Sequence, residues 1–243
     1  MSWNRTTAIA KRVISQVLRD RRTLGLIFFV PIVVMSLVGF SFADQRFILD
    51  SAAPALLAVF ALFFTFVLTG VSFLRERAYG TLERLLATPV GRGDIIVGYL
   101  AGFLLFAGMQ SLIILLFTIL ALQVHYQGAL WQIFLLLMVL TIVGVNLGIF
   151  VSTFARNEFQ VVQFIPLVLA PQIFLSGILL PVAQMPWYFR GASKVFPLTY
   201  AVEGLRDIML RGMGLLDVLP ELGVLAAFAV ALIVLATGVV RRA

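Results

Sequence analysis

Six long apolar stretches, separated by short polar segments, dominate the pattern of hydrophobic and polar positions along the chain. A helix needs about 20 predominantly apolar residues to cross the hydrocarbon core of a bilayer. The stretches that meet this requirement are Thr23–Phe42, Ala52–Leu74, Ile95–Leu122, Ala129–Phe154, Val161–Leu180 and Leu222–Val240. The pattern predicts an all-α membrane protein with six transmembrane helices.

Composition supports the same class. Of the 243 residues, 62% are hydrophobic and 12% are charged, and the mean hydropathy is +1.08. A water-soluble domain of this size would not tolerate so apolar a surface. We therefore expect residues 1–243 to form a single transmembrane domain.

The distribution of basic residues predicts the orientation of the chain. Lysine and arginine near the ends of spans are retained on the cytoplasmic side of a membrane. Thirteen basic residues fall on the side that holds both termini, the segment 75–94 and Arg156, whereas five fall on the other side. Both termini are therefore predicted to be cytoplasmic. The net charge of +7 is then explained by topology and by anionic lipid headgroups. The lipid bilayer is therefore the expected partner, and binding of nucleic acid is not expected.

The segment before the first span, within residues 1–22, has the pattern of an amphipathic helix. Its apolar residues, among them Ile9, Val13 and Val17, occupy about half of a helical wheel, and Lys11 and Arg12 lie on the other half. This predicts an interfacial helix on the cytoplasmic leaflet. A simple lipid anchor explains the pattern equally well.

A polar segment, Arg75–Asp94, separates the second and third apolar stretches. Its charges, Gly80 and Pro89 prevent it from spanning a bilayer, yet Leu82, Leu85 and Leu86 share one face at helical spacing. The segment is predicted to be a short surface helix that contacts another protein. An ordinary charged loop is the alternative.

The connection 181–220 lies on the opposite side and is longer than the other loops. It combines prolines and aromatic residues with an amphipathic stretch from Ala201 to Leu210. This stretch is too short and too charged to cross. The connection is predicted to form two short helices that dip into, or lie on, the outer leaflet.

The residues needed for several kinds of chemistry are missing from the sequence. Neither Lys11 nor Lys194 follows the glycines of a phosphate-binding loop, so no nucleotide site is predicted. The sequence has one histidine and no cysteine, and no acidic cluster falls within a span, so no metal site or catalytic group is predicted. Polar residues at membrane depth include Gln110, Asn146 and Gln163, which could line a pathway or join helices by hydrogen bonds. If the protein uses energy, that energy is supplied from outside this chain.

Two motifs resemble the membrane subunits of ABC-2 type transporters. The first contains Glu76, Gly80–Glu83, Leu85, Leu86, Thr88 and Pro89, and the second contains Phe174–Gly177, Pro181, Pro186, Phe196–Tyr200, Glu203 and Arg206. With the six spans and the N-terminal helix, the resemblance covers nearly the whole chain.

The resemblance implies a transmembrane permease subunit without its own enzymatic activity. Its partners would be a second permease subunit, as a homodimer or heterodimer, and two copies of a separate ABC ATPase that binds ATP and Mg²⁺, while this chain binds no cofactor. The complex would lie in the bacterial cytoplasmic (inner) membrane and export its substrate. The resemblance does not define this substrate, but the aromatic residues, 22 Phe in particular, favour an apolar or amphipathic one such as a drug, an antibiotic or a lipid-linked or glycan-type molecule. An ATP-independent channel, or a scaffold subunit of a membrane complex, is the alternative.

The resemblance also assigns roles to residues. The residues implied in ATPase coupling are Arg75, Glu76, Gly80, Thr81, Leu82, Glu83, Leu85, Leu86, Thr88 and Pro89. Ile9, Val13 and Val17 would belong to a connecting helix. Pro181, Pro197, Tyr200, Glu203 and Arg206 would belong to an outer re-entrant segment.

Overall fold

Helices account for the regular structure of the chain. The computed structural model describes residues 3–88 and 90–240, except for the side chains of Leu82, Glu83, Leu86, Arg92, Thr237, Val239 and Val240. In order, the helices are α1 (Trp3–Arg19), α2 (Arg21–Ser41), α3 (Arg46–Ala78), α4 (Thr81–Leu86), α5 (Arg92–Leu120), α6 (Leu130–Ser152), α7 (Glu158–Leu175), the 3₁₀ turn η1 (Val182–Gln184), α8 (Trp187–Ser193), α9 (Pro197–Arg211) and α10 (Leu219–Val240). The described residues include no strand.

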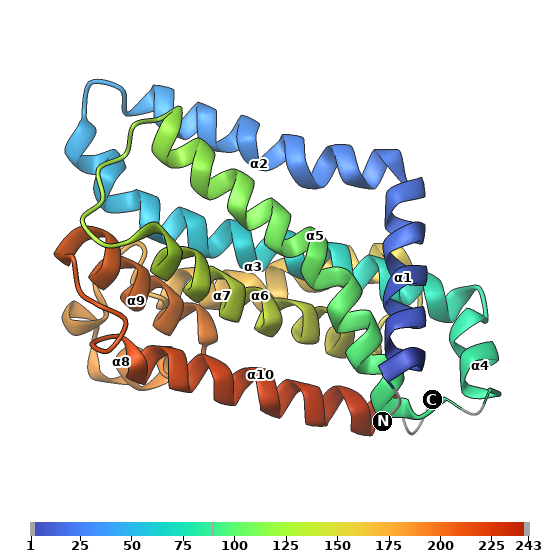
Figure 1. The fold of residues 1–243 in the computed structure, drawn as a ribbon. Helices are drawn as coiled ribbons and strands as arrows, with labels where there is room; N and C mark the ends of the chain where they lie inside the picture. The colour runs from blue at the N-terminus through green and yellow to red at the C-terminus, as the bar shows by residue number, and fades with distance from the viewer. Residues whose placement is uncertain (1–2, 89, 241–243) are drawn as a thin grey trace.

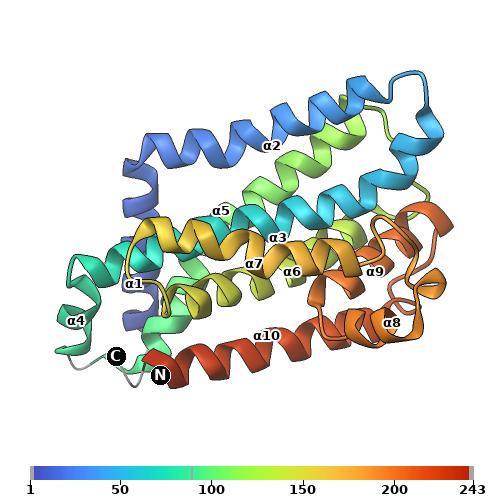
Figure 2. The same ribbon diagram turned by 180° about the vertical axis from the view of Figure 1, so that it is seen from behind.

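Six of these helices are long and apolar enough to cross a membrane, as counted over the described residues. They are α2, α3, α5, α6, α7 and α10, which confirms the six predicted spans. The spans lie side by side, and α1 runs across their ends next to α4 (Figure 1). We call this the α4 end. The reverse view shows α8 and α9 at the opposite end (Figure 2).

The second span is longer than its apolar run predicts. Helix α3 has 33 residues, which corresponds to about 50 Å at 1.5 Å per residue. A hydrocarbon core is about 30 Å thick, so α3 is long enough to extend beyond it. Arg75 and Glu76 belong to the last turns of α3, and the separate helix α4 is limited to Thr81–Leu86.

Helices α3 and α6 form the centre of the bundle. In the most apolar window of each, 61% of the residues are buried, compared with 17% in α7 and α10. Glycines allow the close approach: a Cβ atom on Gly148 would lie 2.8 Å from the Phe66 carbonyl oxygen and 3.0 Å from the Gly70 nitrogen.

Helix α1 packs on α5 through the apolar face that the sequence predicts. Ile9, Val13 and Val17 are buried. Cβ atoms on Gly98 and Gly102 would lie 2.7 Å from Ile9 and 2.8 Å from Val13. The apolar face of α1 therefore covers protein, which a simple lipid anchor does not explain. Its position at the cytoplasmic leaflet stays a prediction.

The connection between α7 and α10 contains η1, α8 and α9. Pro181 precedes η1, and Pro197 is the first residue of α9. One face of α9 is buried, including Pro197, Val202 and Leu205, and it packs within the same hydrophobic core as α3 and α6. The two short helices of this connection are thus present, and their depth in the outer leaflet stays a prediction.

Gly148→Ala should destabilise the protein. The added methyl group would meet backbone atoms of α3, which cannot move aside without shifting the helix, and overpacking of this kind costs about 1–3 kcal/mol. Gly25→Ala is the matched control because its Cβ would meet nothing within 4 Å. Thermal unfolding of the purified variants in detergent measures the difference, and equal unfolding midpoints would contradict the close packing of α3 and α6.

Candidate functional site

The carboxylate of Glu76 joins three helices at the α4 end. Its side chain is 8% exposed, and Arg12 of α1 donates a hydrogen bond to Oε2 over 2.5 Å. The hydroxyl of Thr81, the first residue of α4, contacts the same oxygen and the Glu76 carbonyl oxygen, the latter at 2.8 Å. A buried carboxylate needs such partners, because unpaired burial of a charge is costly. Glu76 therefore fixes α1 and α4 to the end of α3.

Gly80 produces the turn between α3 and α4. Its φ angle is 65°, in the left-handed region that favours glycine, and its N–H donates to the Arg77 carbonyl oxygen over 3.0 Å. This turn ends α3 and brings Thr81 back to Glu76. The left-handed conformation of this turn thus explains why the predicted motif has a glycine at position 80.

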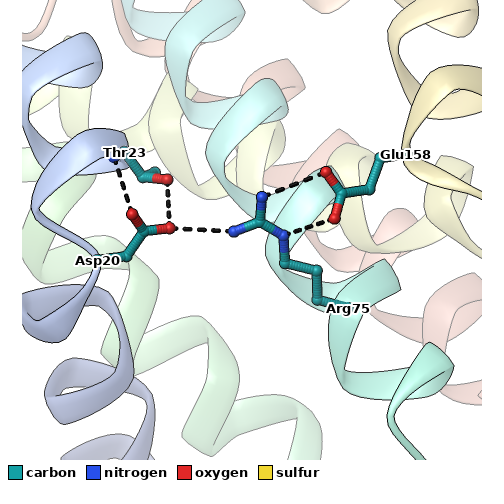
Figure 3. A network of polar contacts seen from close by, with 4 residues as sticks. All are labelled: Asp20, Thr23, Arg75 and Glu158. Carbon is teal, nitrogen blue, oxygen red and sulfur yellow. Dashed lines mark hydrogen bonds and ion pairs between the residues drawn. The ribbon is translucent and has the colours of Figure 1, made fainter.

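Arg75 forms a second charged link, shown in Figure 3. Its guanidinium binds both carboxylate oxygens of Glu158, at 2.8 and 3.2 Å, and Asp20 Oδ2 at 3.0 Å. Asp20 precedes α2, and Glu158 begins α7. Arg75 therefore connects the ends of the first, second and fifth spans.

Asp20 also caps α2. Its Oδ1 accepts a hydrogen bond from the Thr23 N–H over 3.1 Å, and its Oδ2 accepts one from the Thr23 hydroxyl over 2.5 Å. The Thr23 side chain contributes most, ahead of Arg75, to holding the pKa of Asp20 below its usual value of 3.8. Asp20 is consequently ionised in the folded protein at neutral pH.

Two further polar side chains tie the α4 end together. Asp94, in the first turn of α5, is buried and accepts hydrogen bonds from the Gly91 N–H over 3.3 Å and from the Thr6 hydroxyl over 3.5 Å. Arg77 donates to the carbonyl oxygens of Ser152 and Thr153, both over 3.1 Å, at the end of α6. Movement of the α3 end would therefore disturb α1, α5 and α6 together.

The structure brings together only part of the predicted coupling set. Arg75, Glu76, Gly80 and Thr81 form the network above, and Leu85 packs against the hydrophobic cluster shared by α1 and α5. Thr88 is exposed, and its hydroxyl donates to the Leu85 carbonyl oxygen over 2.6 Å. Pro89 and the side chains of Leu82, Glu83 and Leu86 lie outside the described residues. The roles of this set in coupling stay predictions.

The predicted residues of the outer segment lie at the opposite end. Arg206 donates to the Gly177 carbonyl oxygen over 2.7 Å, and the Tyr200 hydroxyl donates to the Lys194 carbonyl oxygen over 3.0 Å. Glu203 is half-buried, and burial raises its pKa. These contacts hold α9 to the loops around it.

The three polar residues predicted within the spans have different environments. Gln110 and Asn146 are buried, and the Asn146 amide donates to the Ile142 carbonyl oxygen over 2.8 Å. Gln163 is exposed on α7. None of the three lines the hollows described below.

Sequence reasoning missed three members of the charged network: Arg12, Asp20 and Glu158. Asp20 and Glu158 had detectable signals, because acidic residues are favoured at helix N-termini. No signal in the sequence indicates that Asp20 and Glu158 both bind Arg75, because this contact depends on how three spans pack.

These features define the class of the protein as a helical, multi-span membrane protein with a polar network at one end of its spans. The sequence matches the family described as ABC-2 type transporter over residues 4–210. The chain belongs to this family, which confirms the resemblance in its two motifs.

Several curated proteins are similar to this chain. ABC transporter G family member 20 of Dictyostelium discoideum is 31% identical over 76% of this chain and 25% of its own length. The probable multidrug ABC transporter permease YbhS of Escherichia coli K12 is 27% identical over 70% of this chain and 44% of its own length. Nodulation protein J of Rhizobium meliloti is 31% identical over 73% of this chain and 67% of its own length. The chain thus spans less than half the length of the first two relatives.

Glu76→Gln should loosen α4 and destabilise the α4 end. Glutamine keeps the shape of the side chain but removes the charge that pairs with Arg12, so we expect a loss of about 1–3 kcal/mol. Glu158→Gln is the matched control, because its side chain is 50% exposed and an exposed ion pair contributes at most about 1 kcal/mol. Thermal unfolding compares the two. Equal losses would show that the burial of Glu76 has no special effect.

Asp20→Asn should have an effect that depends on pH. Asparagine preserves the helix cap but not the charge facing Arg75. Because the folded-state pKa of Asp20 is lowered, the stabilisation by its charge is full above about pH 4 and is lost as the pH falls through the folded-state value. Denaturation at a series of pH values should show a variant less stable than the wild type near neutral pH, with the gap closing in acid. A gap that persists in strong acid would contradict this assignment.

Proposed function

We propose that the chain is the transmembrane subunit of an ATP-driven ABC exporter, energised by a separate ATPase that docks at the α4 end. The observation that carries the proposal is the buried contact of Glu76 with Arg12 and Thr81. This contact ties the short helix α4 to a span. A force applied to α4 would therefore reach the spans.

The size of α4 supports a docking role. A helix of six residues is not stable by itself, so its conformation depends on contacts. Gly80 and Thr81 supply the contacts on one side, and a docked partner would supply those on the other. Helix α3 then acts as a lever, because one continuous helix runs from this junction to the far end of the bundle.

The orientation of the complex follows from charge. The α4 end carries most of the basic residues, so it is assigned to the cytoplasm, with both termini on that side of a bacterial inner membrane. The ATPase subunits, in two copies, would bind ATP and Mg²⁺ there. A second permease subunit would complete the transporter. The substrate pathway would then lie between the two helix bundles, so that a single bundle need not contain one.

Export of an apolar or amphipathic molecule is the proposed activity. The family assignment supports transport, and one relative carries the name of a probable multidrug permease. The spans contain apolar surfaces and few charges, which suits a substrate that partitions into lipid.

Replacement of Leu82 and Leu86 together by serine should weaken association with the separate ATPase. Loss of the apolar face should reduce affinity at least about tenfold, which equals about 1.4 kcal/mol. Co-purification and ATPase turnover in the presence of the permease measure the effect. Leu216→Ser is the control, because Leu216 is exposed at the opposite end. If the double variant keeps full association and transport, coupling through α4 is excluded. If the wild-type chain does not associate with any ATPase, an ATP-independent channel or scaffold is the better explanation.

A further inference from the structure

We propose that the α4 end contains a binding site for a lipophilic monovalent cation. The charged head would lie in a cavity beside Asp20 and Glu76, and the apolar body would lie in a groove between α2 and α3. The inference deepens the proposed function, on which it rests, by giving a substrate class and the place where that substrate first binds.

Two adjoining hollows form the site. The cavity has a volume of about 210 Å³ and is lined by polar and aromatic residues of α1, α3 and α5, together with Asp20. The groove has a volume of about 330 Å³ and is lined mainly by apolar residues, among them Ile27, Val30 and Phe64. Thr23, Ser72 and Arg75 line both hollows. One molecule with a polar head and an apolar body could therefore occupy both.

The charge of the network favours a single positive charge. The charged residues that line the two hollows are the carboxylates Asp20 and Glu76 and the guanidinium of Arg75. These lining side chains carry one negative charge in excess, which one monovalent cation would balance. Arg19, Arg21 and Arg22 are exposed to solvent and line neither hollow.

Aromatic rings add a second form of complementarity. Tyr79, Tyr99 and Phe103 line the cavity, and the rings of Tyr99 and Phe73 are 5.3 Å apart in an edge-to-face arrangement. Aromatic faces attract organic cations, and the attraction strengthens when water is excluded. Tyr99 is 1% exposed, and its hydroxyl makes no well-formed hydrogen bond within the described part of the chain. A polar group of a ligand in the cavity could satisfy it.

A third hollow provides an internal comparison. A groove of about 410 Å³ between α5 and α6 is lined by apolar residues such as Leu112 and Phe134, with no charged residue. It offers the same kind of hydrophobic surface without a charged end. A ligand that binds through hydrophobic contacts alone would therefore occupy both grooves. The proposed cation would bind only in the groove beside Asp20.

The test uses two amphiphiles with the same alkyl chain and opposite charge. Dodecyltrimethylammonium has a cationic head and an apolar tail, and dodecyl sulfate is its anionic counterpart. Each labelled ion is titrated against the full chain in phosphatidylcholine nanodiscs without ATPase, and the signal from empty nanodiscs is subtracted. We expect saturable binding of dodecyltrimethylammonium, at least about tenfold tighter than any binding of dodecyl sulfate. Equal affinity for both ions, or no saturable binding of the cation, would overturn the proposal.

Variants place the ion in the site. Asp20→Asn removes charge from the cavity, and Val30→Trp fills the groove; each should weaken binding at least about fivefold. Asp44→Asn and Leu112→Trp are the matched controls, because Asp44 is exposed in a loop at the opposite end and Leu112 lies in the uncharged groove. Size-exclusion chromatography verifies that each variant is folded. If Leu112→Trp weakens binding as much as Val30→Trp does, the assigned site is wrong.

The binding test needs no ATPase, so its outcome is separate from that of the proposed function. Loss of cation binding with intact ATPase association would remove this site and leave the coupling role. Cation binding without any ATPase association would support the site and contradict the ATP-driven mechanism.

Discussion

The buried carboxylate of Glu76 is the contact on which the α4 end depends. A charge at this depth is tolerated because Arg12 and Thr81 meet it, and the same partners bring α1 and α4 to the end of α3. If Arg12 or Thr81 is lost, the buried charge of Glu76 is less well compensated, and the packing of α1, α3 and α4 is destabilised. The three helices are therefore expected to move as a unit.

Packing of small residues gives this unit a rigid support. Gly98 and Gly102 let α1 lie directly on α5, and Gly144 and Gly148 let α6 lie on α3. Close backbone contact leaves little room for a helix to tilt by itself. A displacement at the α4 end is consequently transmitted along α3, whose 33 residues form one helix.

The sequence predicted the spans well because a membrane helix is determined by the length and apolarity of a local run. The buried face of α1 was predictable for a similar reason, since the spacing of Ile9, Val13 and Val17 is local. The charged network was not, because Arg75 meets partners 55 and 83 residues away. Gln163 shows the converse limit: its position within an apolar run suggested a place in a pathway or a hydrogen bond between helices, but it is exposed, because packing decides which face of α7 is buried.

In the proposed transporter, the position of Arg75 would connect coupling and ligand binding. Its side chain joins Asp20 to Glu158, and it also lines both hollows beside α2 and α3. A cation near Asp20 would compete with Arg75 for that carboxylate and would weaken the link between the first and second spans. Binding energy at this place therefore acts on the same helix ends that a docked ATPase would move. Because coupling between two ligands is reciprocal, a substrate that loosens this link should also alter the affinity for the ATPase.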